Sequence, residues 1–210
     1  SFFTFIVLSS WKDTITVLKS CESLSPWAEN LQIVRRCCDS IAWKASRSHF
    51  VAGESSVAEE WWYEDVTHLR IDHFGRIMTA LTAKGTKPES IVGCIMQYAE
   101  RWLRGMIDEL PEMKKEMQFG ICSKNETPLC PENVKEQKNI IEVLVSLLPV
   151  NQAVPCQFLS RLLKLALAYS ASPALISELE KRVGMTLETA TVKDLLIPNY
   201  RYGGQETPAK

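Results

Sequence analysis

Residues 72–103 read DHFGRIMTALTAKGTKPESIVGCIMQYAERWL, and their apolar side chains recur at the three- and four-residue spacing of amphipathic helices. One apolar stripe lies within residues 74–81, with Asp72 as its predicted cap and Gly85 as its predicted end. Pro88 predicts the start of a second helix. Because the link between these helices is short, they are expected to form an antiparallel hairpin.

The helical pattern continues on both sides of this hairpin. It covers residues 11–45, whereas residues 46–56 hold a glycine and four serines and predict a loop. Further helix starts are predicted downstream at Pro131, Pro155 and Pro173, and the last of these helices is expected to end at Gly184. No segment alternates apolar and polar residues over the length of a strand. The sequence therefore predicts an all-α fold, an irregular array of antiparallel helical hairpins with about eight or nine helices.

The same pattern predicts how the chain is divided. Residues 9–104 are expected to form an N-terminal helical layer, and residues 131–200 a C-terminal layer of the same domain. Residues 105–130 lack an apolar period and accumulate glycine and proline, so they predict a mobile connection. Residues 201–210 form a polar tail. The helix after Pro155 is apolar on most of its circumference, which predicts a central position.

Composition excludes several classes of function. The net charge of −1 gives no general attraction to nucleic acid or to an anionic membrane. No segment is long and apolar enough to span a bilayer. The seven cysteines are an odd number, and most lie within apolar helical patterns, which indicates reduced thiols in a cytoplasmic protein. Because the chain begins without methionine and ends on polar residues, we expect it to be a piece of a longer protein.

Candidate catalytic and metal-binding residues are few. His68 and His73 lie near acidic residues, but a predicted helix break separates them and no third ligand cluster accompanies them. Both histidines are therefore expected at solvated helix ends. No glycine-rich phosphate loop follows a strand, so no cofactor is predicted. The alternative of an enzyme would need a site assembled from distant residues, for instance Glu64, His68 and Cys94.

The aromatic run at residues 61–63 is the least ordinary feature of the sequence. Adjacent indoles on a helix point to different sides, so one ring can enter the core while the other stays near the surface. The register favours Trp62 as the core ring. Packing between helices is the more common role of such aromatic residues. The alternative is a partner-binding surface formed by Trp61, Tyr63, Glu64 and Asp65.

Four blocks in this chain together resemble the central domain of the plant non-phototropic hypocotyl/root phototropism family. They begin with SSWKDTITVLKSC, EEWWYEDVTHLR, SLLPVNQAVPCQF and SPALISELEKRVG, at residues 9–45, 59–81, 146–166 and 172–200. The blocks follow one another in order and cover nearly the whole chain.

The resemblance implies a non-catalytic protein-interaction domain without a cofactor. Family members combine an N-terminal BTB domain, this helical domain and often a C-terminal coiled coil. The BTB domain engages a cullin, which makes such proteins substrate adaptors of ubiquitin ligases. Members act with phototropin-type receptor kinases in blue-light signalling, and in auxin-transporter polarity, commonly at the periphery of the plasma membrane.

This chain also departs from the family pattern. It has no BTB domain, so cullin binding is expected to lie outside it. The family domain continues beyond the DLLIPNY block, so apolar surface is expected to be exposed here. Arg104 replaces a proline that is frequent in relatives, which predicts a longer helix at that point. A structural spacer between a BTB domain and a coiled coil is the alternative to an interaction domain.

Overall fold

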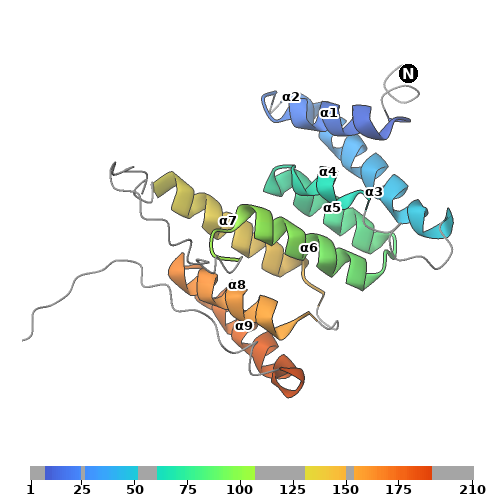
Figure 1. Ribbon diagram of the computed structural model, residues 1–210. Coiled ribbons are helices and arrows are strands. Elements are labelled where there is room, and N and C mark those ends of the chain that lie inside the picture. The colour runs from blue at the N-terminus through green and yellow to red at the C-terminus, as the bar shows by residue number, and fades with distance from the viewer. Residues whose placement is uncertain (1–7, 25–26, 52–60, 107–130, 150–153, 191–210) are drawn as a thin grey trace, which may run out of the picture.

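The computed structural model describes residues 8–24, 27–51, 61–106, 131–149 and 154–190. These ranges contain nine α-helices, one short 3-10 helix and no strand, which confirms the predicted all-α fold (Figure 1). The helices are α1 (Trp11–Cys21), α2 (Trp27–Asn30), α3 (Ile33–Val51), α4 (Tyr63–Thr67), α5 (Ile71–Ala83), α6 (Pro88–Trp102), α7 (Pro131–Leu147), α8 (Cys156–Ala168) and α9 (Pro173–Thr186), followed by η3 (Leu187–Thr189).

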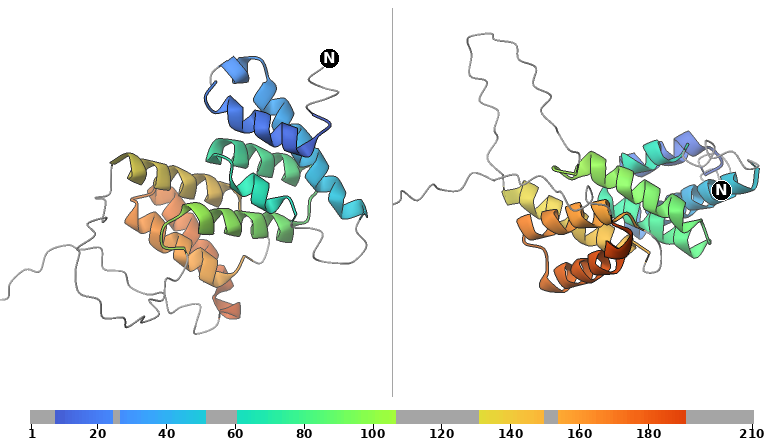
Figure 2. Two further views of the ribbon diagram at one scale, coloured as in Figure 1. Left: turned by 45° about the horizontal axis from the view of Figure 1, so that its top comes forward. Right: turned by 60° about the horizontal axis from the view of Figure 1, so that its bottom comes forward.

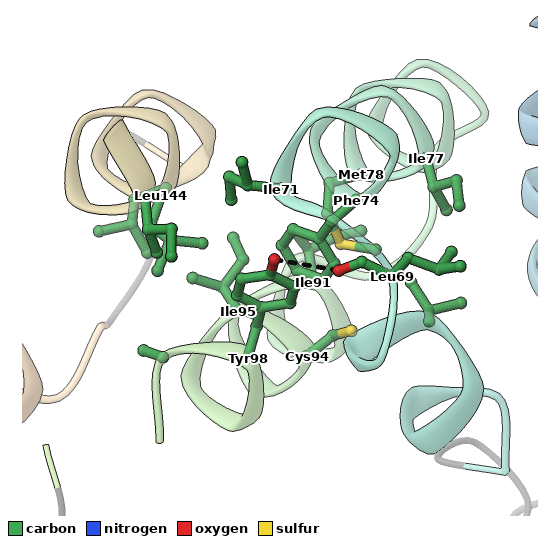
Figure 3. Close-up of a cluster of buried hydrophobic side chains, with 14 of the residues drawn as sticks. Leu69, Ile71, Phe74, Ile77, Met78, Ile91, Cys94, Ile95, Tyr98 and Leu144 are labelled. Carbon is green, nitrogen blue, oxygen red and sulfur yellow. Dashed lines mark hydrogen bonds between the residues drawn. The ribbon is translucent and has the colours of Figure 1, made fainter. Parts of the chain in front are cut away.

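The hairpin of α5 and α6 forms as predicted. Helix α5 is followed by Gly85, whose φ of 75° lies in the left-handed region that glycine tolerates best, and α6 begins with Pro88. The rings of Phe74 of α5 and Tyr98 of α6 pack against each other, tilted by 31°, with their centroids 4.0 Å apart. The hydroxyl of Tyr98 donates a hydrogen bond of 3.0 Å to the carbonyl oxygen of Leu69 (Figure 3). This bond satisfies a polar group that would otherwise be buried alone.

Helix α5 is the central element of the described chain. It packs against α3, α6 and α7, and its buried face meets Leu144 of α7 and Ile95 of α6 in one apolar cluster (Figure 3). Helix α5 begins two residues earlier than it would with Asp72 as its cap, because the buried Ile71 extends its apolar stripe. Arg70 is the cap residue. Asp72 lies in the first turn, where its negative charge interacts favourably with the positive end of the helix dipole.

The prediction of a central position for α8 is wrong. Helices α8 and α9 lie side by side at one end of the molecule, next to α7 (Figures 1 and 2). Leu167 of α8 is 55 % exposed. Several neighbours pack around the apolar circumference of α8: α7, α9, and the segment at Gly105 and Met106. The carbonyl of Met106 accepts a hydrogen bond of 2.7 Å from Arg161 of α8.

Two helices run further than their sequences predict. Helix α3 continues to Val51, so residues 46–51 of the predicted loop are helical, while residues 52–56 lie outside the described ranges. Serine is only a weak helix breaker, and the Ser46 hydroxyl donates to the Trp43 carbonyl within the helix. Helix α9 continues past Gly184, since an interior glycine costs a helix only about 1 kcal/mol.

The expected connection at 105–130 is packed where it begins. Met106 is buried, and residues 107–130 lie outside the described part of the chain, as do the last ten residues of the expected C-terminal layer and the tail at 201–210. Arg104 does not lengthen α6, which ends at Trp102. The buried amide of Gln137 on α7 holds this end: it donates to the Trp102 carbonyl at 2.9 Å and accepts from the Arg104 backbone N–H at 3.3 Å.

Candidate functional site

The two aromatic residues around the start of α4 belong to the core. Trp62 is 2 % exposed, as its register predicts, and its ring meets the ring of Tyr63 edge-on at 4.6 Å. The hydroxyl of Tyr63 donates a hydrogen bond of 2.6 Å to the carbonyl of Ser90 on α6. A Cβ atom at Gly93 would lie 3.1 Å from that hydroxyl, so glycine allows the close approach. Tyr63 is therefore a structural residue, and we omit it from the candidate surface.

Trp61 faces outward beside this buried pair. Its side chain is 46 % exposed, and its ring lies 4.6 Å from the ring of Trp11 at the start of α1. The indole nitrogen Nε1 of Trp11 donates a hydrogen bond of 2.7 Å to Oδ2 of Asp65. Glu64 is exposed next to them. We call these four residues, Trp11, Trp61, Glu64 and Asp65, the Trp61 surface.

Polar contacts connect the Trp61 surface to the end of α6. His68 contacts the Glu64 carbonyl through Nδ1 at 2.6 Å, and its Nε2 contacts the guanidinium of Arg101. Because the guanidinium can only donate, the imidazole is the Nδ1–H tautomer here. Trp102 donates from Nε1 to the carbonyl of Thr67 at 2.8 Å. These contacts tie the short helix α4 to α6, so the surface is rigidly supported.

The residues of the enzyme alternative have different surroundings. Glu64 of α4 and His68, which caps the end of α4, are exposed, whereas Cys94 of α6 is fully buried in the apolar cluster of Figure 3. Burial raises the pKa of the Cys94 thiol well above its usual value, because the thiolate would lose its hydration. A nucleophilic cysteine needs the opposite shift. The arrangement therefore gives no support to a site built on Cys94.

A second candidate region is a groove of about 930 Å³ lined by α3, α5 and α7 and by residues of α1 and α2. Three ion pairs lie along it. Arg76 binds Glu29 at 2.8 Å, and this hydrogen bond raises the pKa of the guanidinium. The other two are more open pairs, Arg70–Asp72 at 3.8 Å and Arg35–Asp39 at 4.0 Å. We call this region the α5 groove.

His73 is the residue of the α5 groove that sequence reasoning missed. It was expected at a solvated helix end, but it is 7 % exposed. The signal in the sequence is its position four residues before Ile77 of the apolar stripe, which places both on one side of the helix. Burial lowers the pKa of His73, opposed by the nearby carboxylate of Glu22. The neutral imidazole is therefore favoured.

Within the described ranges, no three His, Cys, Asp or Glu side chains converge closely enough to hold a metal ion. Among the same residues, no helix has the length and apolarity needed to cross a bilayer.

The described residues thus form an all-helical domain that presents the indole of Trp61 on a support of packed neighbours. The model of the NPH3 family matches residues 60–209, and the chain belongs to that family. It is 48 % identical to "BTB/POZ domain-containing protein DOT3" of Arabidopsis thaliana, over 98 % of the chain and 35 % of that protein.

Two further relatives carry phototropism in their names. "Root phototropism protein 3" of Arabidopsis thaliana is 37 % identical over 98 % of the chain and 39 % of its own length. "Coleoptile phototropism protein 1" of Oryza sativa subsp. japonica is 35 % identical over 95 % of the chain and 36 % of its own length. The chain thus spans little more than a third of these relatives. No solved structure matches it.

Proposed function

We propose that this chain is the non-catalytic protein-interaction domain of a substrate adaptor for a cullin-type ubiquitin ligase, acting in plant light or auxin signalling. Membership of the NPH3 family and the names of its BTB/POZ-containing and phototropism relatives support this. The cullin would be bound by a BTB domain outside the chain. The domain described here would bind the substrate or receptor.

The observation that carries the proposal is the exposed ring of Trp61. Tryptophan is the residue type most enriched at the energetic centres of protein interfaces. The ring rests on Trp11, which is held by its hydrogen bond to Asp65. Much of the side-chain order that binding needs is therefore already present in the free protein, so less conformational entropy is lost when a partner binds.

The partners we propose are phototropin-type receptor kinases or polarity proteins. Binding them would place the protein in the cytoplasm, at the periphery of the plasma membrane. Glu64 and Asp65 border the indole with negative charge, which would guide a partner with a basic rim and disfavour an acidic one.

The test is affinity capture of the full-length protein from plant membranes. Trp61→Ala should lose the receptor or polarity partner, with a binding loss of about 2 kcal/mol or more, and should still capture cullin. Trp27→Ala is the matched control, because Trp27 is 73 % exposed on α2 and lies outside the Trp61 surface. If Trp61→Ala and a variant without the whole domain both keep every partner, the domain is a spacer.

A further inference from the structure

We propose that the α5 groove is a second docking site, which takes one basic side chain, lysine or arginine, from a polypeptide partner. Glu22 and Nδ1 of His73 would be its two acceptors. This site is separate from the Trp61 surface, since Glu22 caps the end of α1 and lies about 16 Å along that helix from Trp11.

Nδ1 of His73 and the carboxylate of Glu22 face one another across the groove without a hydrogen bond between them. Nδ1 of His73 lies 3.9 Å from Oε1 of Glu22, which is too far for a hydrogen bond. That nitrogen is buried and has no hydrogen-bond partner among the described residues. In the proposal the neutral imidazole carries its proton on Nε2, so Nδ1 is an acceptor, as the carboxylate is. A shared N–H donor would satisfy both atoms.

The charges that line the α5 groove favour a cationic donor over a neutral one. The lining arginines Arg35, Arg70 and Arg76 each have an acidic partner within the groove. Among the described ion pairs, the carboxylate of Glu22 faces only His73, which carries a positive charge only when it is protonated. The side chain of Glu22 is 30 % exposed, so its charge is partly removed from water. A neutral donor would leave that charge uncompensated, whereas an ammonium or guanidinium would neutralise it.

The groove also has room and apolar wall for the stem of such a side chain. Ile71 and Ala80 of α5 and Val143 and Leu147 of α7 line it together with the polar residues. Long basic side chains bury their methylene groups along apolar surface while the charged end meets its partner. A volume of about 930 Å³ holds that side chain with several residues of its backbone.

The test uses the protein labelled with ¹⁵N at its three histidines, whose imidazole nitrogens give separate NMR signals. The probe is Nα-acetyl-lysine methylamide, a single lysine in peptide form. Its matched control is Nα-acetyl-norleucine methylamide, which has the methylene stem without the ammonium group. The His73 signal is assigned with His73→Gln.

The lysine probe should shift Nδ1 of His73 in a saturable way, and the norleucine probe should not. Glu22→Gln should weaken the lysine probe at least about fivefold. Glu89→Gln removes an exposed carboxylate outside the groove and should leave its affinity unchanged. No saturable shift, an equal shift with norleucine, or equal affinity in Glu22→Gln would each overturn the proposal. The first result would mean that water occupies the acceptor pair.

Discussion

Trp61 and Trp62 are adjacent in the sequence and lie in opposite surroundings. Trp62 is 2 % exposed and is packed against Tyr63, whereas Trp61 is 46 % exposed and rests on Trp11. The burial of one ring fixes the backbone, so the neighbouring ring is held outward in a defined orientation. A domain can thus present a large apolar side chain without losing its own stability.

The largest expected effect on stability comes from replacing Trp62, the buried ring of the two. Trp62→Ala should lower the free energy of unfolding by about 3–5 kcal/mol, because it leaves a cavity the size of an indole. For a chain of this length the melting temperature should fall by about 6–20 °C. Trp27→Ala, at a 73 % exposed position, should change it by no more than about 2 °C. Equal small changes in both variants would contradict the assignment of Trp62 to the core.

Tyr63→Phe tests the polar part of the same buried region. The variant keeps the ring and loses the hydrogen bond to the Ser90 carbonyl, which is left buried without that donor. The expected loss is about 1–3 kcal/mol, measured by chemical denaturation. An unchanged denaturation midpoint would mean that the hydroxyl does not hold α4 on α6.

Trp11→Phe tests the support of the exposed ring. Phenylalanine keeps an aromatic ring beside Trp61 but cannot donate to Asp65. A double-mutant cycle with Asp65→Ala should give a coupling of about 1 kcal/mol in the free energy of unfolding. Additive effects of the two substitutions would show that the hydrogen bond does not order the Trp61 surface.

The smallest expected effect concerns the pH dependence of His73. Burial lowers its pKa from the ordinary value of 6.5, so the folded protein favours the neutral ring. The resulting stability is present above pH 6.5 and is lost as the pH falls through the lowered pKa, because the unfolded chain then binds the proton more readily. Between pH 7.5 and 5.5, His73→Gln should lose less stability than the parent protein.

Glu22→Gln is the companion variant for this pH measurement. It removes the carboxylate that raises the pKa of His73 but leaves the buried imidazole in place. The free energy of unfolding of this variant should therefore still fall between pH 7.5 and 5.5. If His73→Gln and the parent protein lose stability equally over this range, His73 is not buried in its neutral form.

Local spacing was enough to predict the centre of the fold. The apolar stripe of α5, the glycine after it and the proline that starts α6 are short-range signals, and the structure forms them as expected. The core position of Trp62 was also predictable, because its register with Val66 and Leu69 depends only on helical geometry.

Long-range contacts were not predictable from the same signals. The hydrogen bond from Trp11 to Asp65 joins residues 54 positions apart, and the α5 groove combines residues from five helices. The position of α8 was missed for the same reason. An apolar circumference indicates that a helix is covered, but it does not say which elements cover it.

The role of Trp61 is tested most directly by Trp61→Ala, measured for stability and for partner capture in the same full-length protein. We expect a melting temperature within about 2 °C of the parent, as for an exposed side chain, together with loss of the captured receptor or polarity partner. A melting temperature that falls as far as that of Trp62→Ala would make Trp61 a core residue. Undiminished capture of every partner would contradict its role as the anchor of the interaction surface.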